Sequence, residues 1–260
     1  VDLEAATLDD ARSFFDRYYA PANAVLTVAG DVDTDQVLRW VEEHFGDIPG
    51  RAVPRRPSFA EPPLTEPRWG VVEDPLAPAP AVAMAWRVPD PTDLPSYLPY
   101  VVLAEVLTDG DAARLQQRLL LQDRVATSVG GYLGVMGDAF DARDPMPLML
   151  EVHHAPDVKV RTVVDTVDEE VERLAHDGCD SDEVARTVAR MTARYLRDID
   201  PVLGRATHAA VLEQQRDRAE LLNEVPELLA GVTAEQVIAA AATLRRDNRA
   251  VLEHRPGGAR

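Results

Sequence analysis

One pattern, a helix start followed by a turn and an apolar strand, occurs twice in this chain at a fixed separation. Thr7 begins the sequence TLDDA and Thr233 begins TAEQV, and both have the composition of a capped helix start. Ala24 begins AVL and Ala250 begins it again, and both pairs of positions are 226 residues apart. Helix–turn–strand units are common, so chance can produce such a match. An internal duplication also explains why the two offsets agree, and it predicts two similar units.

A proline-rich stretch separates the two copies. Residues 47–67 have few apolar residues between six prolines, which are Pro49, Pro54, Pro57, Pro62, Pro63 and Pro67. Proline fixes φ and lacks a backbone donor, so this composition is typical of an extended linker. The sequence therefore predicts a C-terminal remnant of a first domain at 1–50, a linker at 51–67 and a second domain at 68–260.

The first domain is expected to be incomplete. In the second copy 165 residues lie between the end of the linker and Thr233, whereas six residues precede Thr7 in the first. A strand at Asn23–Gly30, NAVLTVAG, would then have no neighbours and would expose its apolar face, which is unfavourable. We therefore expect another chain, or a segment removed by cleavage, to supply the missing part.

Hydrophobic spacing predicts helices and strands in two groups. Apolar residues repeated every three or four positions indicate helices, and apolar or β-branched runs indicate strands. Helices are expected at 7–20, 33–45, 93–109, 112–122, 156–176, 180–198, within 200–230 and from 233, and strands at 23–30, 68–73, 81–88, 125–135, 148–153 and 250–252. Asp180 and Glu183 have the spacing of a capping pair. The order predicts an α+β fold of two homologous layered domains, with helices packed on mostly antiparallel sheets.

The charge balance excludes one class of partner. The chain has 45 Asp and Glu residues against 27 Lys and Arg, a formal net charge of −18. Such a surface repels nucleic acid and attracts basic peptides. No apolar run approaches the roughly 18 residues that suggest a membrane span. The single cysteine, Cys179, excludes an internal disulfide and is compatible with a reducing compartment such as a bacterial cytoplasm.

Three stretches resemble a known family. Phe14–Pro49 reads FFDRYYAPANAVLTVAGDVDTDQVLRWVEEHFGDIP and resembles the end of the first domain of the pitrilysin/insulinase family of zinc metallopeptidases, the group that includes mitochondrial processing peptidase. Gly110–Gly134 reads GDAARLQQRLLLQDRVATSVGGYLG and resembles the matching region of the second domain, where the usual pattern is similar to SSRLFQEVREKRGLAYSV. The ending VTAEQVIAAAATLRRDNRAVLEHRP also fits, so the resemblance covers essentially the whole chain.

The resemblance implies a clamshell in which paired homologous domains enclose a chamber for unfolded peptides. Its zinc motif, H-x-x-E-H, lies in the first domain of the family. None of the six histidines here fits that motif or H-E-x-x-H: His44, His153, His154, His176, His208 and His254. Zinc is therefore expected for the complete enzyme but outside this chain. It would be held by an N-terminal fragment or companion subunit, in a homo- or heterodimer.

The resemblance also implies a substrate-holding Arg and Tyr in the second domain, spaced R-x-x-x-x-x-x-Y. Aligning Ala113-Arg114-Leu115 with the family's S-R-L places Leu120 at the Arg position and Thr127 at the Tyr position. Leucine cannot donate to a peptide carbonyl, and threonine is too short to replace tyrosine. The substrate-binding pair is thus expected to be lost, and no catalytic residue is expected in this chain. The loss of this pair is expected if the chain is part of the zinc-bearing subunit or part of an inactive subunit.

Several other residues have both a functional and an ordinary explanation. Glu151 and His153 share a strand face and could hold a metal, or they are ordinary strand residues. His176 and Cys179 flank a helix end, where a histidine is favourable without any ligand. The glycines at 130, 131 and 134 either let a peptide approach closely or mark a bulge. The acids at 165, 168, 169, 170 and 172 form a solvated helix face, or a chamber surface that favours basic substrates.

Together these observations predict part of a zinc-dependent endopeptidase that degrades or processes peptides in an enclosed chamber. This chain would form chamber wall and a subunit packing surface. The alternative is a non-catalytic structural partner subunit of the same family. The presence or absence of H-x-x-E-H upstream of Val1 distinguishes the two.

Overall fold

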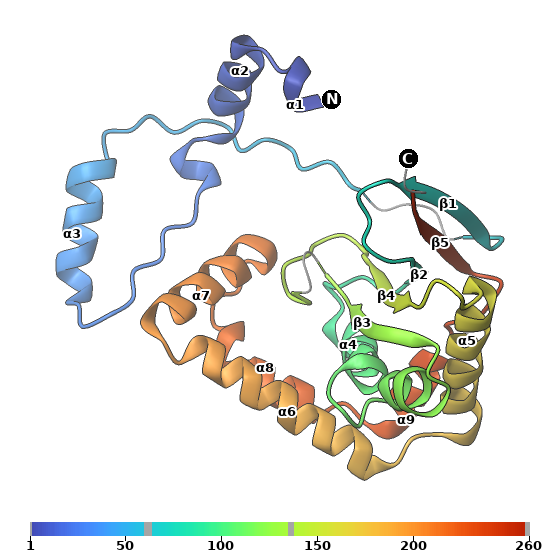
Figure 1. Ribbon diagram of the computed structural model, residues 1–260. Helices are drawn as coiled ribbons and strands as arrows, with labels where there is room; N and C mark the ends of the chain where they lie inside the picture. The colour runs from blue at the N-terminus through green and yellow to red at the C-terminus, as the bar shows by residue number, and fades with distance from the viewer. Residues whose placement is uncertain (1, 60–63, 135–137, 258–260) are drawn as a thin grey trace. The chain divides into compact units, whose positions relative to one another are not determined.

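The computed structural model describes residues 2–59, 64–134 and 138–257, and the chain divides into two compact units. The smaller unit comprises Val1–Ser58 and Leu196–Leu222, and the larger comprises Phe59–Tyr195 and Asn223–Arg260 (Figure 1). Within the described part of the chain, no helix is both long enough and apolar enough to span a membrane.

The larger unit is built on a five-stranded sheet of spatial order β1-β5-β2-β4-β3. Its strands are β1 (Arg68–Asp74), β2 (Ala81–Arg87), β3 (Ala126–Tyr132), β4 (Pro147–His154) and β5 (Arg249–Pro256). β5 lies between β1, to which it is parallel, and β2, to which it is antiparallel. The β2–β4 and β3–β4 pairs are antiparallel. The prediction of a mostly antiparallel α+β fold is therefore confirmed.

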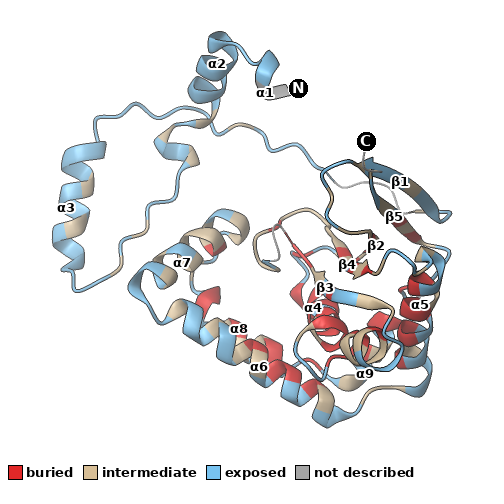
Figure 2. Cartoon of the chain, in the orientation of Figure 1, coloured by how far each residue is buried: buried red, intermediate tan, exposed pale blue. Residues whose placement is uncertain are grey.

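Helices cover one face of this sheet, and the core lies between the two layers. They are α4 (Leu94–Thr108), η2 (Gln116–Gln122, wound as a π-helix), α5 (Val160–Asp177) and α9 (Ala234–Ala241), with α6 (Ser181–Ile199) and α8 (Leu221–Ala230) running across the division between the units. Burial alternates along β2 and β4, because successive side chains of a strand point to opposite faces. Figure 2 shows the buried residues concentrated on α4 and α5.

The other face of the sheet is open. Its positions alternate with the core residues and, apart from Ala81, those of β2 and β4 are half-buried or exposed. They include Ala83 and Ala85 of β2, Glu151 and His153 of β4, and Gly130 of β3. Small side chains occupy the middle of this open face, which we define by these residues together with Ser128, Ala250 and His254.

The smaller unit consists of helices with little buried surface. They are α1 (Asp2–Ala5), α2 (Leu8–Tyr18), η1 (Pro21–Asn23), α3 (Thr34–Phe45) and α7 (Val202–Arg216). The predicted helix start at Thr7 is a capping box, in which Thr7 Oγ1 accepts from the Asp10 N–H and Asp10 accepts from the Thr7 N–H. Neither α2 nor α3 has a buried residue, and Phe14, Phe15 and Trp40 are at least half exposed.

The predicted strand at Asn23–Gly30 is not formed. Residues 24–29 are extended, but they pair with no strand among the described residues. A strand requires a neighbouring ladder for its backbone groups, and apolar composition alone does not provide one. Val25, Leu26 and Val28 are between 39% and 61% exposed. This is the state expected of a strand whose sheet neighbours lie outside the described residues.

Other predicted elements differ from the structure mainly at their ends. The helix predicted from Pro156 begins at Val160, because the Val158 N–H donates to Ala155 O across a turn. The helix predicted at 112–122 begins after a turn and is largely a π-helix. The strand predicted at 125–135 is β3 and ends at Tyr132, while residues 135–137 lie outside the described residues.

Candidate functional site

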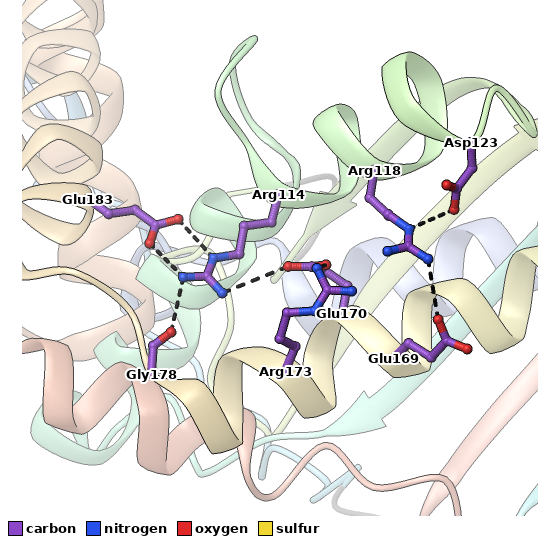
Figure 3. Close-up of polar contacts among 8 residues, drawn as sticks. All are labelled: Arg114, Arg118, Asp123, Glu169, Glu170, Arg173, Gly178 and Glu183. Carbon is purple, nitrogen blue, oxygen red and sulfur yellow. Dashed lines mark hydrogen bonds and ion pairs between the residues drawn. The ribbon is translucent and has the colours of Figure 1, made fainter.

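The family-like segment Gly110–Gly134 leads from the end of α4 through η2 into the edge strand β3. Arg114 fixes its start (Figure 3). Arg114 Nε and Nη2 donate to the two oxygens of Glu183 at 2.9 and 2.8 Å, and Nη2 donates to Gly178 O at 3.1 Å. Arg114 Nη1 lies 3.8 Å from Glu170, whose side chain is 6% exposed. The hydrogen bonds to Glu183 are the main cause that raises the Arg114 pKa, so its charge is permanent.

Arg118 fixes the other end of η2. Its Nε donates to Asp123 at 2.6 Å, and its Nη2 donates to Glu169 of α5 at 3.4 Å (Figure 3). The bond to Asp123 is the main cause that raises the pKa of Arg118. The segment that carries the family motif is thus attached to α5 and α6 by the ion pairs of Arg114 and Arg118.

Glu183 corrects one prediction from the sequence. It does not cap α6; instead, Asp180 Oδ1 accepts from the Asp182 N–H at 3.0 Å. A bidentate carboxylate–guanidinium pair is stronger than a bond to a backbone N–H, and Arg114 is within reach.

The two positions of the family's Arg and Tyr lie on this segment. Leu120 is half-buried in η2. Thr127 is exposed and is the extra residue of a β-bulge, since Ala126 pairs with His154 and Ser128 with His153. Between them, these two side chains offer one hydroxyl group. Their assignment to substrate binding remains a prediction.

The three glycines differ in role. A Cβ on Gly131 would lie 2.7 Å from Thr108 Cγ2 and 2.8 Å from Leu150 Cδ2, so this glycine permits close packing of β3. Gly134 has φ +82°, a left-handed conformation that favours glycine. Gly130 has open space around its Cβ position, on the open face. The predicted bulge is at Thr127 and not at a glycine, which leaves Gly130 as the position where a peptide could approach.

Polar side chains form a row across one end of the open face. Ser128 Oγ lies 3.2 Å from His153 Nδ1, and His153 Nε2 lies 3.8 Å from Glu151. His254 lies 3.7 Å from Asp74. Ala81 pairs with both His153 and His254, so the two histidines are on either side of one small residue. Glu151 and His153 can be paired from the sequence because they alternate on one strand, whereas Ser128 and His254 lie on other strands and join them only through the sheet register.

Zinc does not fit the residues present. Among the described residues, no group of three or more His, Cys, Asp or Glu side chains could hold a metal ion. Glu151 and His153 alone are two ligands, fewer than the three or four of protein zinc sites.

The row of acids on α5 is only partly a solvated face: Glu169 and Glu172 are exposed, and Asp165 is half-buried. Asp168 and Glu170 are buried, and they pair with Arg249 and with Arg114 and Arg173 respectively. The other members of the row that pair are Glu169, with Arg118, and Glu172, with Arg246. Buried carboxylates require such partners, so Asp168 and Glu170 have a structural role, and Asp168 connects α5 to β5.

The two residues predicted at the α5 end are structural. His176 is exposed, and its Nδ1 lies 2.9 Å from Asp177. Cys179 is half-buried; burial, followed by the charge of Glu183, raises the pKa of its thiol. A thiol with a raised pKa is a poor nucleophile at neutral pH.

Comparisons with known proteins place this geometry in a family. The family model described as the peptidase M16 inactive domain matches residues 5–191. An uncharacterized protein of Caenorhabditis elegans is 34% identical over 137 residues, which are 50% of this chain and 14% of that protein. The zinc protease PqqE of Helicobacter pylori is 29% identical over 134 residues, which are 48% of this chain and 29% of that protein. The chain thus matches under a third of the length of these curated relatives.

Solved structures share the fold. A protease from Helicobacter pylori superposes with a TM-score of 0.86 at 20% identity, over 98% of this chain and 60% of that one. A peptidase M16 inactive domain from Pseudomonas fluorescens gives 0.79 at 17% identity, over 98% and 59%. The family match covers most of the chain and includes two of the three family-like stretches, Phe14–Pro49 and Gly110–Gly134. The chain therefore belongs to the peptidase M16 family, and it carries that family's inactive domain.

Proposed function

We propose that the chain is the non-catalytic half of a zinc endopeptidase, and that a companion domain or subunit holds the metal. One observation carries the proposal: a family whose relatives include a zinc protease is matched by a chain in which the described residues offer no metal site. Leu120 and Thr127, at the positions predicted for the family's Arg and Tyr, support a role in enclosing peptides and not in holding them.

The smaller unit is proposed as the surface that the companion covers. By the internal repeat, Ala24–Leu26 corresponds to Ala250–Leu252 of β5, which has a sheet neighbour on each side. The extended segment has none among the described residues and instead forms one wall of a shallow cavity of about 430 Å³ against α7. Pairing with companion strands would satisfy its backbone and remove Leu26 from water, which is worth roughly 1.5–3 kcal/mol for a fully buried leucine.

The open face of the larger unit is proposed as chamber wall. Ala83, Ala85 and Gly130 leave its middle without large side chains, so a peptide backbone can approach closely. Extended peptides bind such surfaces mainly through main-chain contacts, which tolerate many sequences.

Co-expression tests the proposal. This chain is co-expressed with the companion that carries H-x-x-E-H. The companion is either another segment of the same polypeptide, expressed separately, or a second subunit. We expect a stable complex that hydrolyses a fluorogenic peptide and loses this activity with a chelator, whereas each part alone is inactive. Leu26→Asp should weaken complex formation at least about tenfold, from the burial it loses. Leu76→Asp is the matched control, at a fully solvated turn of the larger unit.

Two results would count against this function. Chelator-sensitive hydrolysis by the chain alone would place the metal here after all. A stable complex without hydrolysis of any peptide would favour a structural subunit. Equal complex formation by L26D and L76D would remove the docking role of the extended segment.

A further inference from the structure

β1 is one edge of the five-stranded sheet of the larger unit, and its outer side pairs with no strand among the described residues (Figure 1). Trp69, Val71 and Val72 are between 39% and 45% exposed. Proteins usually protect a sheet edge with a bulge, a proline or a charge within the strand. The opposite edge, β3, has such a bulge at Thr127, whereas β1 keeps a continuous register with β5 and has charged residues only at its ends. An unprotected edge of this kind can accept a further strand.

The direction of the backbone groups of β1 follows from its pairing with β5. Gly257 N–H donates to Asp74 O at 2.8 Å and continues the parallel ladder between the two strands. Successive residues of a strand direct their N–H and C=O groups to opposite sides. Asp74, Val72 and Gly70 therefore bond toward β5. The residues between and before them present both backbone groups at the free edge, and they are Trp69, Val71 and Glu73.

The two ends of β1 have opposite charge. At its first end, a cavity of about 360 Å³ is lined mainly by residues of β1, α5 and β5. The charged residues of its wall are four arginines and two aspartates: Arg68, Arg161, Arg246, Arg249, Asp165 and Asp168. Asp168 pairs with Arg249, whereas Arg161 stacks on Trp69 at 4.2 Å and forms no ion pair with a described residue. The cavity is therefore positive, and the other end of β1 is negative because its last two residues are acidic.

We propose that β1 pairs in antiparallel orientation with β1 of a second copy of this chain, about a two-fold axis at Val71. Val71 then exchanges both backbone bonds with Val71 of the second copy, and Trp69 does so with Glu73 of the second copy. Every backbone group at the free edge thus has a partner. This interface is separate from the extended segment 24–29 and goes beyond the proposed peptidase role.

The charges agree with this pairing. Glu73 of the second copy lies opposite Trp69 on the same face of the sheet, so its carboxylate lies near Arg161 at the positive cavity. Arg68 lies opposite Asp74 of the second copy. Both contacts occur twice because the axis is two-fold. A parallel pairing in register would instead place like charges together.

Two prolines favour this register over its neighbours. A shift by two residues places Pro67 or Pro75 of the second copy opposite a residue of the free edge. Proline has no N–H, so the carbonyl of that residue loses its donor. A shift by one residue sets the free groups against groups already bonded to β5. The register centred on Val71 is therefore the one that satisfies all of β1.

Sedimentation equilibrium of the full-length protein tests the proposal. One strand edge is small beside the roughly 1,200–2,000 Å² that stable complexes bury, so we expect a reversible dimer with a dissociation constant of about 10 µM. Val71→Pro removes a donor that β5 does not use and should weaken the dimer at least about tenfold. Val71→Thr keeps this N–H in a β-branched residue and should change the dissociation constant by less than about threefold.

A charge exchange tests the register. Glu73→Arg and Arg161→Glu should each weaken dimerisation at least about tenfold, because each change acts at two symmetry-related contacts. An equimolar mixture of the two variants should dimerise to within about threefold of the unchanged protein, since every contact then joins opposite charges. Recovery in the mixture also shows that both variants fold. Glu227→Arg reverses one exposed charge on α8, outside β1 and the cavity, and should leave the dissociation constant unchanged.

Amide hydrogen exchange gives a readout at single residues. Exchange at Val71 should slow as the protein concentration rises, whereas exchange at Val72, which already bonds to β5, should change little. A protein that stays monomeric up to about 1 mM, a dimer that the charge changes leave intact, or no recovery in the mixture would overturn the proposal. Loss of the dimer in the assembly with the companion that carries H-x-x-E-H would also overturn it, because the companion would then occupy this edge.

Discussion

Arg114 connects three parts of the chain through one guanidinium group. It joins η2 to Glu183 of α6, to the carbonyl of Gly178 and to the buried Glu170 of α5. Partly buried ion pairs of this kind are sensitive to the loss of one partner, because the other charge is left without compensation in a poorly solvated site.

Arg114→Met should lower the free energy of unfolding by about 2–4 kcal/mol, because it removes the bidentate partner of Glu183 and leaves the buried Glu170 with Arg173 alone. Arg118→Met removes a more exposed pair and should have an effect of about 0.5–1 kcal/mol. Urea unfolding followed by circular dichroism measures both. Equal losses of stability in the two variants would show that the ion pairs of Arg114 contribute no more than those of Arg118. The double variant R114M/E183Q should recover part of the loss, as coupled pairs do.

Cys179 should react slowly with thiol reagents. Burial and the nearby Glu183 raise its pKa, so the thiolate fraction at neutral pH is smaller than for a free cysteine. Alkylation by iodoacetamide should therefore keep accelerating above the ordinary thiol range of about pH 8.5. Glu183→Gln should shift this profile to lower pH. A midpoint at or below that of the urea-unfolded protein would contradict the expectation.

At the scale of elements, β3 contains two neighbouring glycines, of which one packs against α4 and the other lies on the open face. Gly131 allows β3 to approach Thr108 of α4, and Gln116 of η2 donates to Val129 O at 2.9 Å. Gly130 has free space on the open face. Neighbouring residues of a strand point to opposite sides, so a single sequence motif contains one packing position and one surface position.

Gly131→Ala should lower the free energy of unfolding by about 1–3 kcal/mol through overpacking. Gly130→Ala, one residue away, should change it by less than about 0.5 kcal/mol. Thermal or urea unfolding of the two variants gives the comparison. In the assembled enzyme, Gly130→Val should reduce peptide hydrolysis without a loss of stability, if peptides pass over the open face. Unchanged hydrolysis would remove this face from the substrate path.

Many of the helices and strands could be predicted from the sequence, because the signals for them are local. Thr233 forms the predicted capping box with Gln236, and the apolar stripe of α5 is buried as its spacing indicates. Non-local features could not be predicted. Glu183 satisfies a local capping rule but pairs with an arginine 69 positions away. Residues 24–29 have strand composition but no described neighbour, and the Ser128–His153 contact depends on a bulge that composition does not reveal.

At the scale of the whole molecule, one of the two units has a packed core and the other has helices with exposed apolar residues. The larger unit has its own sheet and buried core, whereas α2 and α3 bury no residue. Contiguous exposed apolar surface is uncommon on an isolated protein, and it is typical of an interaction site. The proposed companion would cover it.

Removal of metal should leave this chain unchanged. Because the described residues hold no candidate zinc cluster, EDTA should shift the melting temperature of the isolated chain by less than about 1 °C, as expected where no bound ligand stabilises the fold. The assembled enzyme should lose activity under the same treatment. Atomic absorption of the isolated chain should find less than about 0.1 zinc per chain on the same linkage argument. A clear destabilisation of the isolated chain by EDTA would show that it binds a structural metal.

The position of β5 also determines when the larger unit can fold. β1 and β2 follow one another along the chain, yet they meet only through residues 249–256, which insert between them. During synthesis, β1 therefore has no partner until almost 180 further residues have left the ribosome. Contacts between such distant segments form slowly, and an unpaired strand is prone to aggregation in the meantime. The nascent chain should depend on chaperones until translation has passed its last strand.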